Sequence, residues 1–113
     1  MPTKPNDGRI DYIEFGASDI AATKTFYTAL FGWKFTDYGP DYTSFEDGRL
    51  AGGFAKGGPA PLVVIYAADL EGMEAKVKAA GGVIVKEIFS FPGGRRFHFT
   101  DPGGNELSVW SDQ

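Results

Sequence analysis

The sequence contains no cysteine and a single histidine, His98. Without cysteine the chain has no disulfide framework, no thiolate nucleophile and no zinc site built on thiolates. Positive charge is also scarce, because 11 Lys and Arg residues stand against 15 Asp and Glu residues, giving a net charge of −4, and the basic residues are scattered. Nucleic acid requires clustered positive charge, so we do not expect it as a partner.

Long apolar runs are missing as well. No stretch approaches the length of a membrane span, and the first eight residues, MPTKPNDG, lack the apolar core of a signal peptide. We therefore expect a cytoplasmic protein without a membrane partner. With 113 residues, the chain is long enough for one domain with a real core. Residues 1–8 are expected to be a flexible tail because they have little to bury.

The most informative stretch is residues 9–33, RIDYIEFGASDIAATKTFYTALFGW. Alternating side chains over residues 9–17 predict a strand with two different faces. Asp19 can then cap a helix, and apolar residues follow at helical spacing until Gly32, where a left-handed C-terminal cap is favourable. The stretch is therefore predicted to be a strand followed by a helix.

The same order returns after the linker-like residues 56–61. An apolar run precedes Asp69, which lies 50 residues after Asp19, and Gly82 lies 50 residues after Gly32. A common offset of this kind indicates an internal duplication. We therefore expect one domain over residues 9–111, made of a first module at 9–57 and a second at 61–111.

Three further strands complete each module. They are predicted at residues 34–36, 42–46 and 49–55 in the first module and at 83–88, 95–100 and 105–110 in the second. Asp47-Gly48 predicts a two-residue hairpin turn. Gly52-Gly53 favours a bulge or a close backbone approach, so this strand is expected to bend or to lie beside a cavity or a partner. The predicted fold class is α+β, with two tandem βαβββ modules forming a mixed eight-stranded, cavity-enclosing sheet and two helices packed outside.

In such a fold, one face of each half lies under its helix and the opposite faces can form a concave chamber. Alternation places these residues under the helices: Ile13, Phe15, Val63, Ile65, Phe97, Phe99, Leu107 and Val109. It places these on the chamber side: Tyr12, Glu14, Leu62, Val64, Tyr66, Arg96, His98, Glu106, Ser108 and Trp110. Aromatic walls with a few polar groups are typical of small-molecule pockets.

The doubled unit, with SDIAATKTFYTALFGW in the first half and DPGGNELSVW closing the second, resembles the vicinal oxygen chelate superfamily. This is the group of glyoxalase I, bleomycin resistance proteins and extradiol dioxygenases. The resemblance covers residues 9–111 and is specific for the fold, not for one activity. Enzymes of this family hold a divalent metal with His, Glu or Gln from the first and last strand of each half, and the metal polarises two neighbouring substrate oxygens.

At the positions where the resemblance places the metal ligands, this chain has residues that bind metal ions poorly. The first-strand positions are Tyr12 and Leu62, each seven residues before its cap Asp, and the last-strand position of the second half is Ser108. The counterpart in the first half falls within residues 51–54. None of these is His, Glu or Gln, and Tyr12 would have to lose a phenolic proton with an ordinary pKa of about 10. The resemblance therefore implies no cofactor and no metal at the standard positions.

A divalent metal then remains conceivable only at a non-standard site built from Glu14, His98 and Glu106. His98 and Glu14 are also the candidate catalytic residues, as base and acid, because imidazole titrates near neutrality. The alternative for His98 is a hydrogen-bonded residue of the cavity wall, and for Glu14 a structural charge that is solvated or paired with Arg96. The candidate ligand-binding residues are Tyr12, Tyr66, Arg96, Ser108 and Trp110.

Two functions remain open from the sequence. The first is a metal-independent protein, similar to the drug-sequestering members of the superfamily, that closes its chamber around a small cationic or hydroxylated organic molecule. The second is a lyase, isomerase or dioxygenase of the glyoxalase type, acting through an atypical metal site or through His98 and Glu14. Residues 91–96, FPGGRR, are interpreted as a hairpin connection, with a mobile flap as the alternative. A homodimer is also expected, with Phe31, Phe54 and Phe89 as exposed apolar edges.

Overall fold

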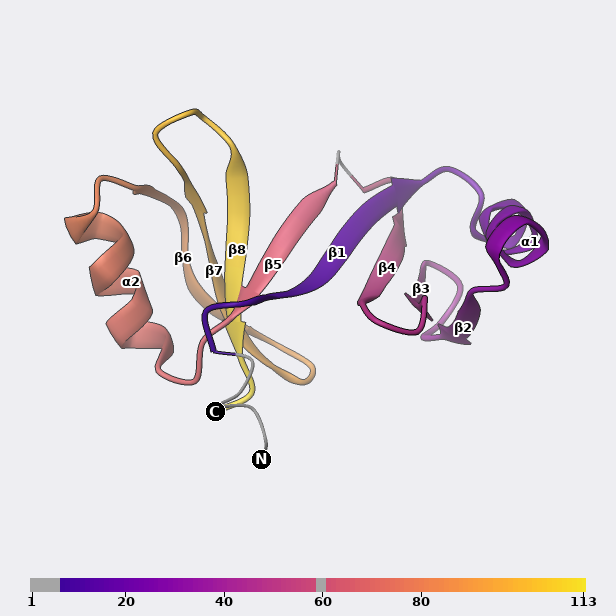
Figure 1. Ribbon diagram of the computed structural model, residues 1–113, viewed down its shortest axis with the longest axis horizontal. Coiled ribbons are helices and arrows are strands. Elements are labelled where there is room, and N and C mark those ends of the chain that lie inside the picture. The colour runs from indigo at the N-terminus through magenta and orange to yellow at the C-terminus, as the bar shows by residue number, and fades with distance from the viewer. Residues whose placement is uncertain (1–6, 59–60) are drawn as a thin grey trace. The chain divides into compact units, whose positions relative to one another are not determined.

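The computed structural model describes residues 7–58 and 61–113. Over these residues the chain forms eight strands and two helices, and its strand pairs are both parallel and antiparallel. The predicted α+β class and the doubled βαβββ order are thereby confirmed (Figure 1). Contacts divide the chain into an α1 unit, Tyr12–Leu62, and an α2 unit, Val63–Gln113 with the described residues of Met1–Asp11. The enclosed chamber stays a prediction.

The α1 unit contains one helix and four strands. Its elements are β1 (Ile10–Ala17), α1 (Ile20–Phe31), β2 (Lys34–Asp37), β3 (Tyr42–Glu46) and β4 (Ala51–Lys56). The strands pair in the order β2-β3-β4-β1, with β1 parallel to β4 and the other pairs antiparallel. Short connections favour the antiparallel pairs, whereas the long excursion through α1, β2 and β3 allows β4 to run parallel to β1.

Both ends of α1 follow the sequence prediction. At its start, the Asp19 side chain accepts a hydrogen bond from the Ala22 N–H at 3.0 Å, which satisfies one of the unpaired donors of the first turn. At its end, Gly32 adopts a left-handed conformation with φ 71°. The strand, cap and helix predicted for residues 9–33 are therefore confirmed.

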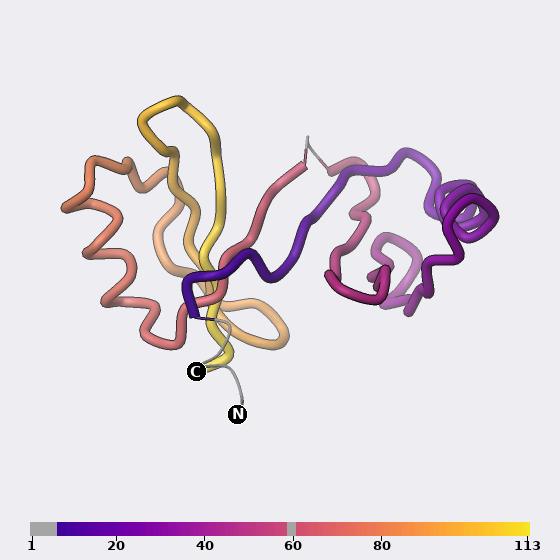
Figure 2. The backbone as a smooth tube through the Cα atoms, viewed as in Figure 1, coloured from indigo at the N-terminus to yellow at the C-terminus, as the bar shows by residue number. Residues whose placement is uncertain are grey.

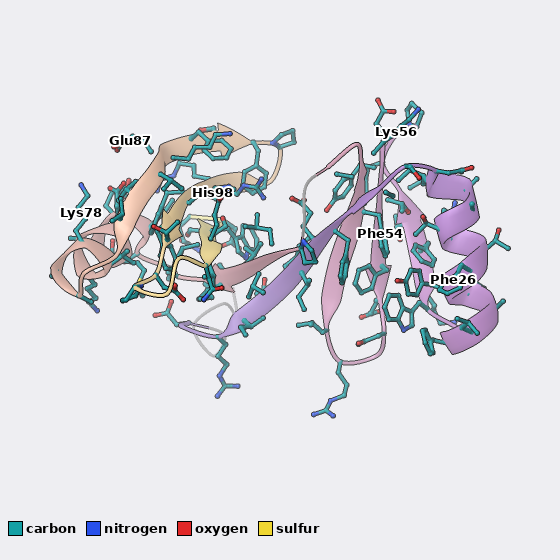
Figure 3. The ribbon with its side chains drawn as sticks, turned by 90° about the horizontal axis from the view of Figure 1, so that it is seen from above. Phe26, Phe54, Lys56, Lys78, Glu87 and His98 are labelled. Carbon is teal, nitrogen blue, oxygen red and sulfur yellow. The ribbon has the colours of Figure 1, made fainter. Side chains whose placement is uncertain are left out.

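Aromatic rings fill the space between α1 and its strands. Phe54 of β4 stacks on Phe15 of β1 with ring centroids 5.2 Å apart, and it contacts Tyr27 of α1 at 5.3 Å. Figure 3 shows Phe54 between the strands and the helix. Because Phe54 is only 3% exposed, the expectation that it forms an exposed apolar edge is wrong. Alternation along β4 turns its side chain to the face that α1 covers.

The α2 unit repeats this arrangement. Its elements are β5 (Leu62–Tyr66), α2 (Leu70–Ala79), β6 (Val83–Phe91), β7 (Gly94–Thr100) and β8 (Glu106–Ser111). The strands pair in the order β5-β8-β7-β6, with β5 parallel to β8 and the other pairs antiparallel. The core lies under α2, where Phe97 and Val109 are buried with Leu70, and Ile65 and Phe99 pack against them. These strand residues were predicted to face the helix, and the prediction is confirmed.

Residues 7–11 run beside the strands of the α2 unit, as the indigo trace shows in Figure 2. The Gly8 N–H donates to the Tyr66 carbonyl at 2.8 Å, and the Asp7 carboxylate accepts from the Ala68 N–H at 2.8 Å. The last two residues of the predicted tail are thus held by hydrogen bonds, and residues 1–6 lie outside the described part of the chain.

Both predicted hairpins are present, but one turn differs from the prediction. β3 and β4 pair antiparallel, and the connection between them spans residues 47–50, so the two-residue length predicted at Asp47-Gly48 is wrong. Asp47 instead accepts the N–H groups of Arg49 and Leu50 at 2.8 and 2.7 Å and closes a longer turn. Between β6 and β7 only residues 92–93 remain outside the strands, so the hairpin interpretation of this segment is confirmed.

Replacing Asp69 by alanine is expected to lower the free energy of unfolding by about 1 kcal/mol. Its side chain accepts from the Gly72 N–H at 3.0 Å at the start of α2, and alanine leaves that donor unpaired. Urea denaturation followed by circular dichroism measures the loss. Asparagine keeps the capping oxygen, so Asp69→Asn should retain most of the stability. An equal loss in both variants would contradict the capping role.

Candidate functional site

The face of the α1 unit opposite its helix carries a cluster of hydroxyl and carboxylate groups. Tyr12 and Glu14 project from β1 and Tyr42 from β3. The Tyr42 hydroxyl donates to Glu14 Oε2 at 3.2 Å and is hydrogen-bonded to the hydroxyl of Tyr12. Burial, followed by the hydrogen bond with Tyr12, raises the pKa of Tyr42, so this residue stays a neutral phenol.

Gly53 of β4 makes room for this cluster. A Cβ atom at Gly53 would overlap the Tyr42 hydroxyl and would lie 2.6 Å from the Tyr12 hydroxyl. The predicted close backbone approach is confirmed at Gly52, where a Cβ would overlap the carbonyl of Ile13, whereas Gly53 is approached by side chains. Tyr42 itself was not among the candidate residues. A glycine in mid-strand indicates that a neighbouring group lies close, but it does not identify which residue supplies that group.

In the α2 unit, the face opposite the helix carries His98. Across β7 and β8, His98 lies opposite Ser108 and Thr100 lies opposite Glu106. His98 Nδ1 lies 3.0 Å from Glu106 Oε2, and His98 is 8% exposed. Its Nε2 is buried without a hydrogen-bond partner among residues 7–58 and 61–113. Figure 3 labels His98 on this face.

The surroundings of His98 keep its ring neutral. Burial lowers the pKa of His98 below its ordinary value, the hydrogen bond to Glu106 opposes this, and the positive charges of Arg96 and Lys86 lower the pKa further. A neutral ring that donates from Nδ1 to a carboxylate has its lone pair on Nε2. His98 is thus a base whose orientation is fixed by Glu106. From the sequence, Glu106 was proposed as a ligand of a non-standard metal site and not as the partner of His98.

Replacing Glu106 by glutamine should lower the pKa of His98 further, because the carboxylate is the main group that favours the protonated ring. NMR titration of the imidazole C–H signals measures this, and the single histidine makes the assignment unambiguous. The pKa of His98 is lower in the folded chain than in the unfolded chain, where it is about 6.5. As the pH decreases below about 6.5, the unfolded chain therefore takes up the proton first, and the free energy of unfolding should fall. A wild-type pKa at or above 6.5 would contradict the burial argument.

Aromatic rings surround Arg96 on the same face. Its guanidinium lies 5.5 Å from the ring centroid of Phe89 and 5.6 Å from that of Phe91. The ring of Phe91 lies 6.3 Å from Trp110, and the ammonium group of Lys86 lies 4.5 Å from Phe89. These cation–π contacts orient two positive charges beside half-buried aromatic surface. Arg96 and Trp110 were predicted for this face from the sequence, whereas Phe89 and Phe91 were not.

Hydrogen bonds hold three further candidate residues. Tyr66 is 1% exposed and donates its hydroxyl to Asp112 at 2.5 Å. Ser108 is fully buried, and its hydroxyl donates to a backbone carbonyl of β7 at 3.1 Å. Trp110 donates its indole N–H to Asp11 at 2.9 Å and is half-buried. Of these three, Trp110 alone presents ring surface that a ligand can contact.

The structure places the two candidate catalytic residues in different units. Glu14 belongs to the α1 unit, where it accepts the hydroxyl of Tyr42, and His98 belongs to the α2 unit, where its ring nitrogen contacts Glu106. The pairing of His98 with Glu14 as acid and base stays a prediction, and so does that of Glu14 with Arg96.

Strand register identifies Gly53 as the first-half counterpart of Ser108. Ser108 lies opposite Val64 across β8 and β5, and Gly53 lies opposite Glu14 across β4 and β1. Glu14 and Val64 are related by the 50-residue repeat. The register therefore narrows the range 51–54 to one residue, and that residue has no side chain.

The donors at the four standard positions do not fit the family's metal. Gly53 offers no ligand, Leu62 is aliphatic, the neutral hydroxyl of the buried Ser108 is a weak ligand, and the hydroxyl of Tyr12 is hydrogen-bonded to Tyr42. Members of the family hold the metal with His, Glu or Gln, and none of these residues stands at the four positions. Within the described ranges, no group of three or more His, Cys, Asp or Glu residues is arranged to hold a metal ion.

Neither helix of the described residues is long and apolar enough to cross a membrane.

Residues 9–109 match the family model described as the Glyoxalase/Bleomycin resistance protein/Dioxygenase superfamily. Anthracycline biosynthesis protein DnrV of Streptomyces peucetius is 32% identical, over 88% of this chain and 45% of that protein, so the chain spans less than half of this relative. The Mn(II)-bound glyoxalase of Novosphingobium aromaticivorans is 24% identical with a TM-score of 0.71, covering 95% of this chain and 40% of that one.

A superfamily member of known structure from Vibrio splendidus 12B01 is 15% identical with a TM-score of 0.71, covering 92% of this chain and 98% of that one. At these identities the two solved structures show a common fold.

Proposed function

The chain belongs to the Glyoxalase/Bleomycin resistance protein/Dioxygenase superfamily, and from this we propose that it binds a small planar organic molecule without a metal at the family's standard positions. The binding surface is the aromatic and basic face of the α2 unit, formed by Phe89, Phe91, Arg96, His98 and Trp110. One observation carries the proposal: half-buried rings flank the guanidinium of Arg96 at 5.5 and 5.6 Å.

A planar ligand suits this face for two physical reasons. Stacking of a ligand ring on half-buried aromatic side chains is favourable, because it removes apolar surface from water. Positive groups beside the rings favour a ligand whose polar edge carries negative charge or oxygen atoms. Both features also suit anthracycline-like compounds, which are planar and hydroxylated, and the name of the relative DnrV supports this class of ligand.

Anthraquinone-2-sulfonate, a planar anion, is a suitable probe for this proposal. We expect Trp110→Leu to weaken its binding at least about tenfold, because the largest ring of the face is lost. Isothermal titration calorimetry measures the affinity, and thermal unfolding checks that the variant is folded. Phe26→Ala is the control, since Phe26 is 55% exposed on α1 and belongs to the other unit. No binding to the wild type, or equal weakening in both variants, would refute the proposal.

A second candidate function is an enzyme of the glyoxalase type, either a lyase, an isomerase or a dioxygenase. The pair of His98 and Glu106 at 3.0 Å favours it, because a carboxylate-oriented imidazole can act as a general base. Metal analysis distinguishes an enzyme with an atypical metal site from one that acts by acid–base chemistry alone. The protein is purified without a His tag and analysed again after incubation with Ni, Zn, Mn and Fe. Retention of about one metal per chain would require a non-standard ligand set and would revise the metal-free proposal.

We also propose that the protein forms a homodimer. Phe31 and Leu30 are 61% and 57% exposed at the end of α1, and apolar side chains of this size are suited to an interface. Light scattering coupled to size exclusion should then give twice the 12.2 kDa of the chain. A mass of one chain at micromolar concentration would refute the dimer and leave the ligand proposal untouched.

A further inference from the structure

The unpaired nitrogen of His98 defines what kind of ligand group this face can accept. Nδ1 lies 3.0 Å from the Glu106 carboxylate, so Nδ1 carries the proton and Nε2 carries the lone pair. Nε2 is buried and has no hydrogen-bond partner in the described part of the chain, and His98 is 8% exposed. Buried polar atoms are nearly always hydrogen-bonded. Nε2 therefore requires a donor that the described residues do not supply.

Charged groups around the ring restrict the chemistry of that donor. Lys86 of β6 lies opposite His98 in the strand register, and Arg96 precedes it by two residues on β7. Both cations lie close to the ring of Phe89, whose centroid is 5.9 Å from that of His98. On β8 the facing charge is Glu106, which already accepts from Nδ1. An ammonium donor would be repelled by the two cations, whereas a donor that becomes negative would be stabilised.

We infer that the ligand of this face carries an acidic hydroxyl, of the phenol or enol class, which donates its hydrogen bond to His98 Nε2. The inference rests on the proposed function and specifies the ligand that it takes. As the hydroxyl ionises, its O–H bond breaks and the proton passes to Nε2, and the resulting imidazolium still donates from Nδ1 to Glu106. The negative charge left on the ligand oxygen is compensated by Arg96 and Lys86.

A matched pair of neutral probes tests this directly, with 2-hydroxyanthraquinone offering the hydroxyl and 2-methoxyanthraquinone lacking it. The wild type should bind the hydroxyl probe at least about tenfold more tightly, because a hydrogen bond to a base in a buried site discriminates strongly against an analogue that cannot donate. Visible absorption gives a second measurement, since the phenolate absorbs at longer wavelength. The bound hydroxyl probe should ionise at a lower pH than the same probe in water.

The variants His98→Gln and Glu106→Gln separate the role of the base from that of ring stacking. His98→Gln should reduce the ratio of the two affinities, hydroxyl probe over methoxy probe, about tenfold or more, because glutamine is not a base that can take up the hydroxyl proton. Glu106→Gln keeps the imidazole but makes it a weaker base, so the bound probe should ionise at a higher pH than in the wild type. The comparison of the two probes on the wild type does not depend on either variant folding.

The outcomes distinguish this inference from the proposed function. If both probes bind the wild type equally, or if the bound hydroxyl ionises at the same pH as in water, the inference is refuted and the binding function stands. If neither probe binds the wild type, the inference and the proposed function are both refuted.

Discussion

Replacing Phe97 by alanine is expected to lower the free energy of unfolding by about 3–5 kcal/mol. Phe97 has no exposed surface and lies in the core of the α2 unit, where it packs with Leu70 and Val109. Truncation removes the buried ring and leaves a cavity that the surrounding strands cannot fill, because they are fixed by their ladders of hydrogen bonds. Since small domains are stable by about 5–15 kcal/mol, this one change removes a large part of the total.

Urea denaturation monitored by far-ultraviolet circular dichroism measures the effect. The matched control is Phe26→Ala, which removes the same atoms from a side chain that is 55% exposed on α1. It should cost less than about 1 kcal/mol, because more than half of the ring is already exposed to solvent and its ring contact with Tyr27 is edge-on. Similar losses for the two substitutions would mean that burial is not what gives Phe97 its importance.

Phe97 illustrates what could be predicted from the sequence. Its alternation with His98 placed it under the helix, and the helix itself was predicted from Asp69 and the apolar spacing that follows. Such features depend on neighbours within a few residues, so periodicity and capping rules are sufficient to find them. The register of β7 and β8 then follows, because a shift by one residue would expose Phe97 and bury the charged neighbours.

The candidate site was only partly predictable, because its contacts join residues that are distant in the sequence. Alternation placed Tyr12, Glu14 and His98 on the face away from the helices, which the hydrogen bonds support. It gave no means of pairing Glu14 with Tyr42, which lies 28 residues away on another strand. The position of Tyr42 depends on a longer turn at residues 47–50 than the Asp47-Gly48 signal predicts, and turn length sets which residues of β3 and β4 face one another.

The two faces also differ in how they depart from the family's metal chemistry. On the α1 unit, the last-strand position is Gly53, and the space is taken by the phenol of Tyr42. On the α2 unit, the equivalent Ser108 is buried and its hydroxyl is donated to the backbone. At Gly53 no side chain is present to bind a metal, and the free space admits a new contact with Tyr42. At Ser108 a weakly ligating hydroxyl takes the place of a carboxylate or imidazole, and no new contact is made.

Replacing Gly53 by alanine should therefore destabilise the α1 unit through Tyr42. The added Cβ would overlap the Tyr42 hydroxyl and approach that of Tyr12 at 2.6 Å, so the hydroxyl cluster must move or break. Overpacking of this kind costs about 1–3 kcal/mol. If Tyr42 is first changed to alanine, the closest overlaps are removed and the Tyr12 hydroxyl is no longer held by Tyr42, so it can move away from the new Cβ. The same Gly53→Ala substitution should then cost much less. The double-mutant cycle is expected to show a coupling of about 1 kcal/mol or more.

Gly52→Ala is the control for this cycle, because the two glycines are neighbours on β4 but point to opposite faces. A Cβ at Gly52 would overlap the backbone carbonyl of Ile13 and the ring of Phe45, which lie on the α1 side. Removal of the Tyr42 side chain opens no space there, so Gly52→Ala should be equally destabilising in the wild type and in the Tyr42→Ala background. Urea unfolding of the four variants of each cycle measures both couplings. If Tyr42→Ala relieved both substitutions to the same extent, the gain would come from general loosening of the unit, and Gly53 would not be the residue that admits Tyr42.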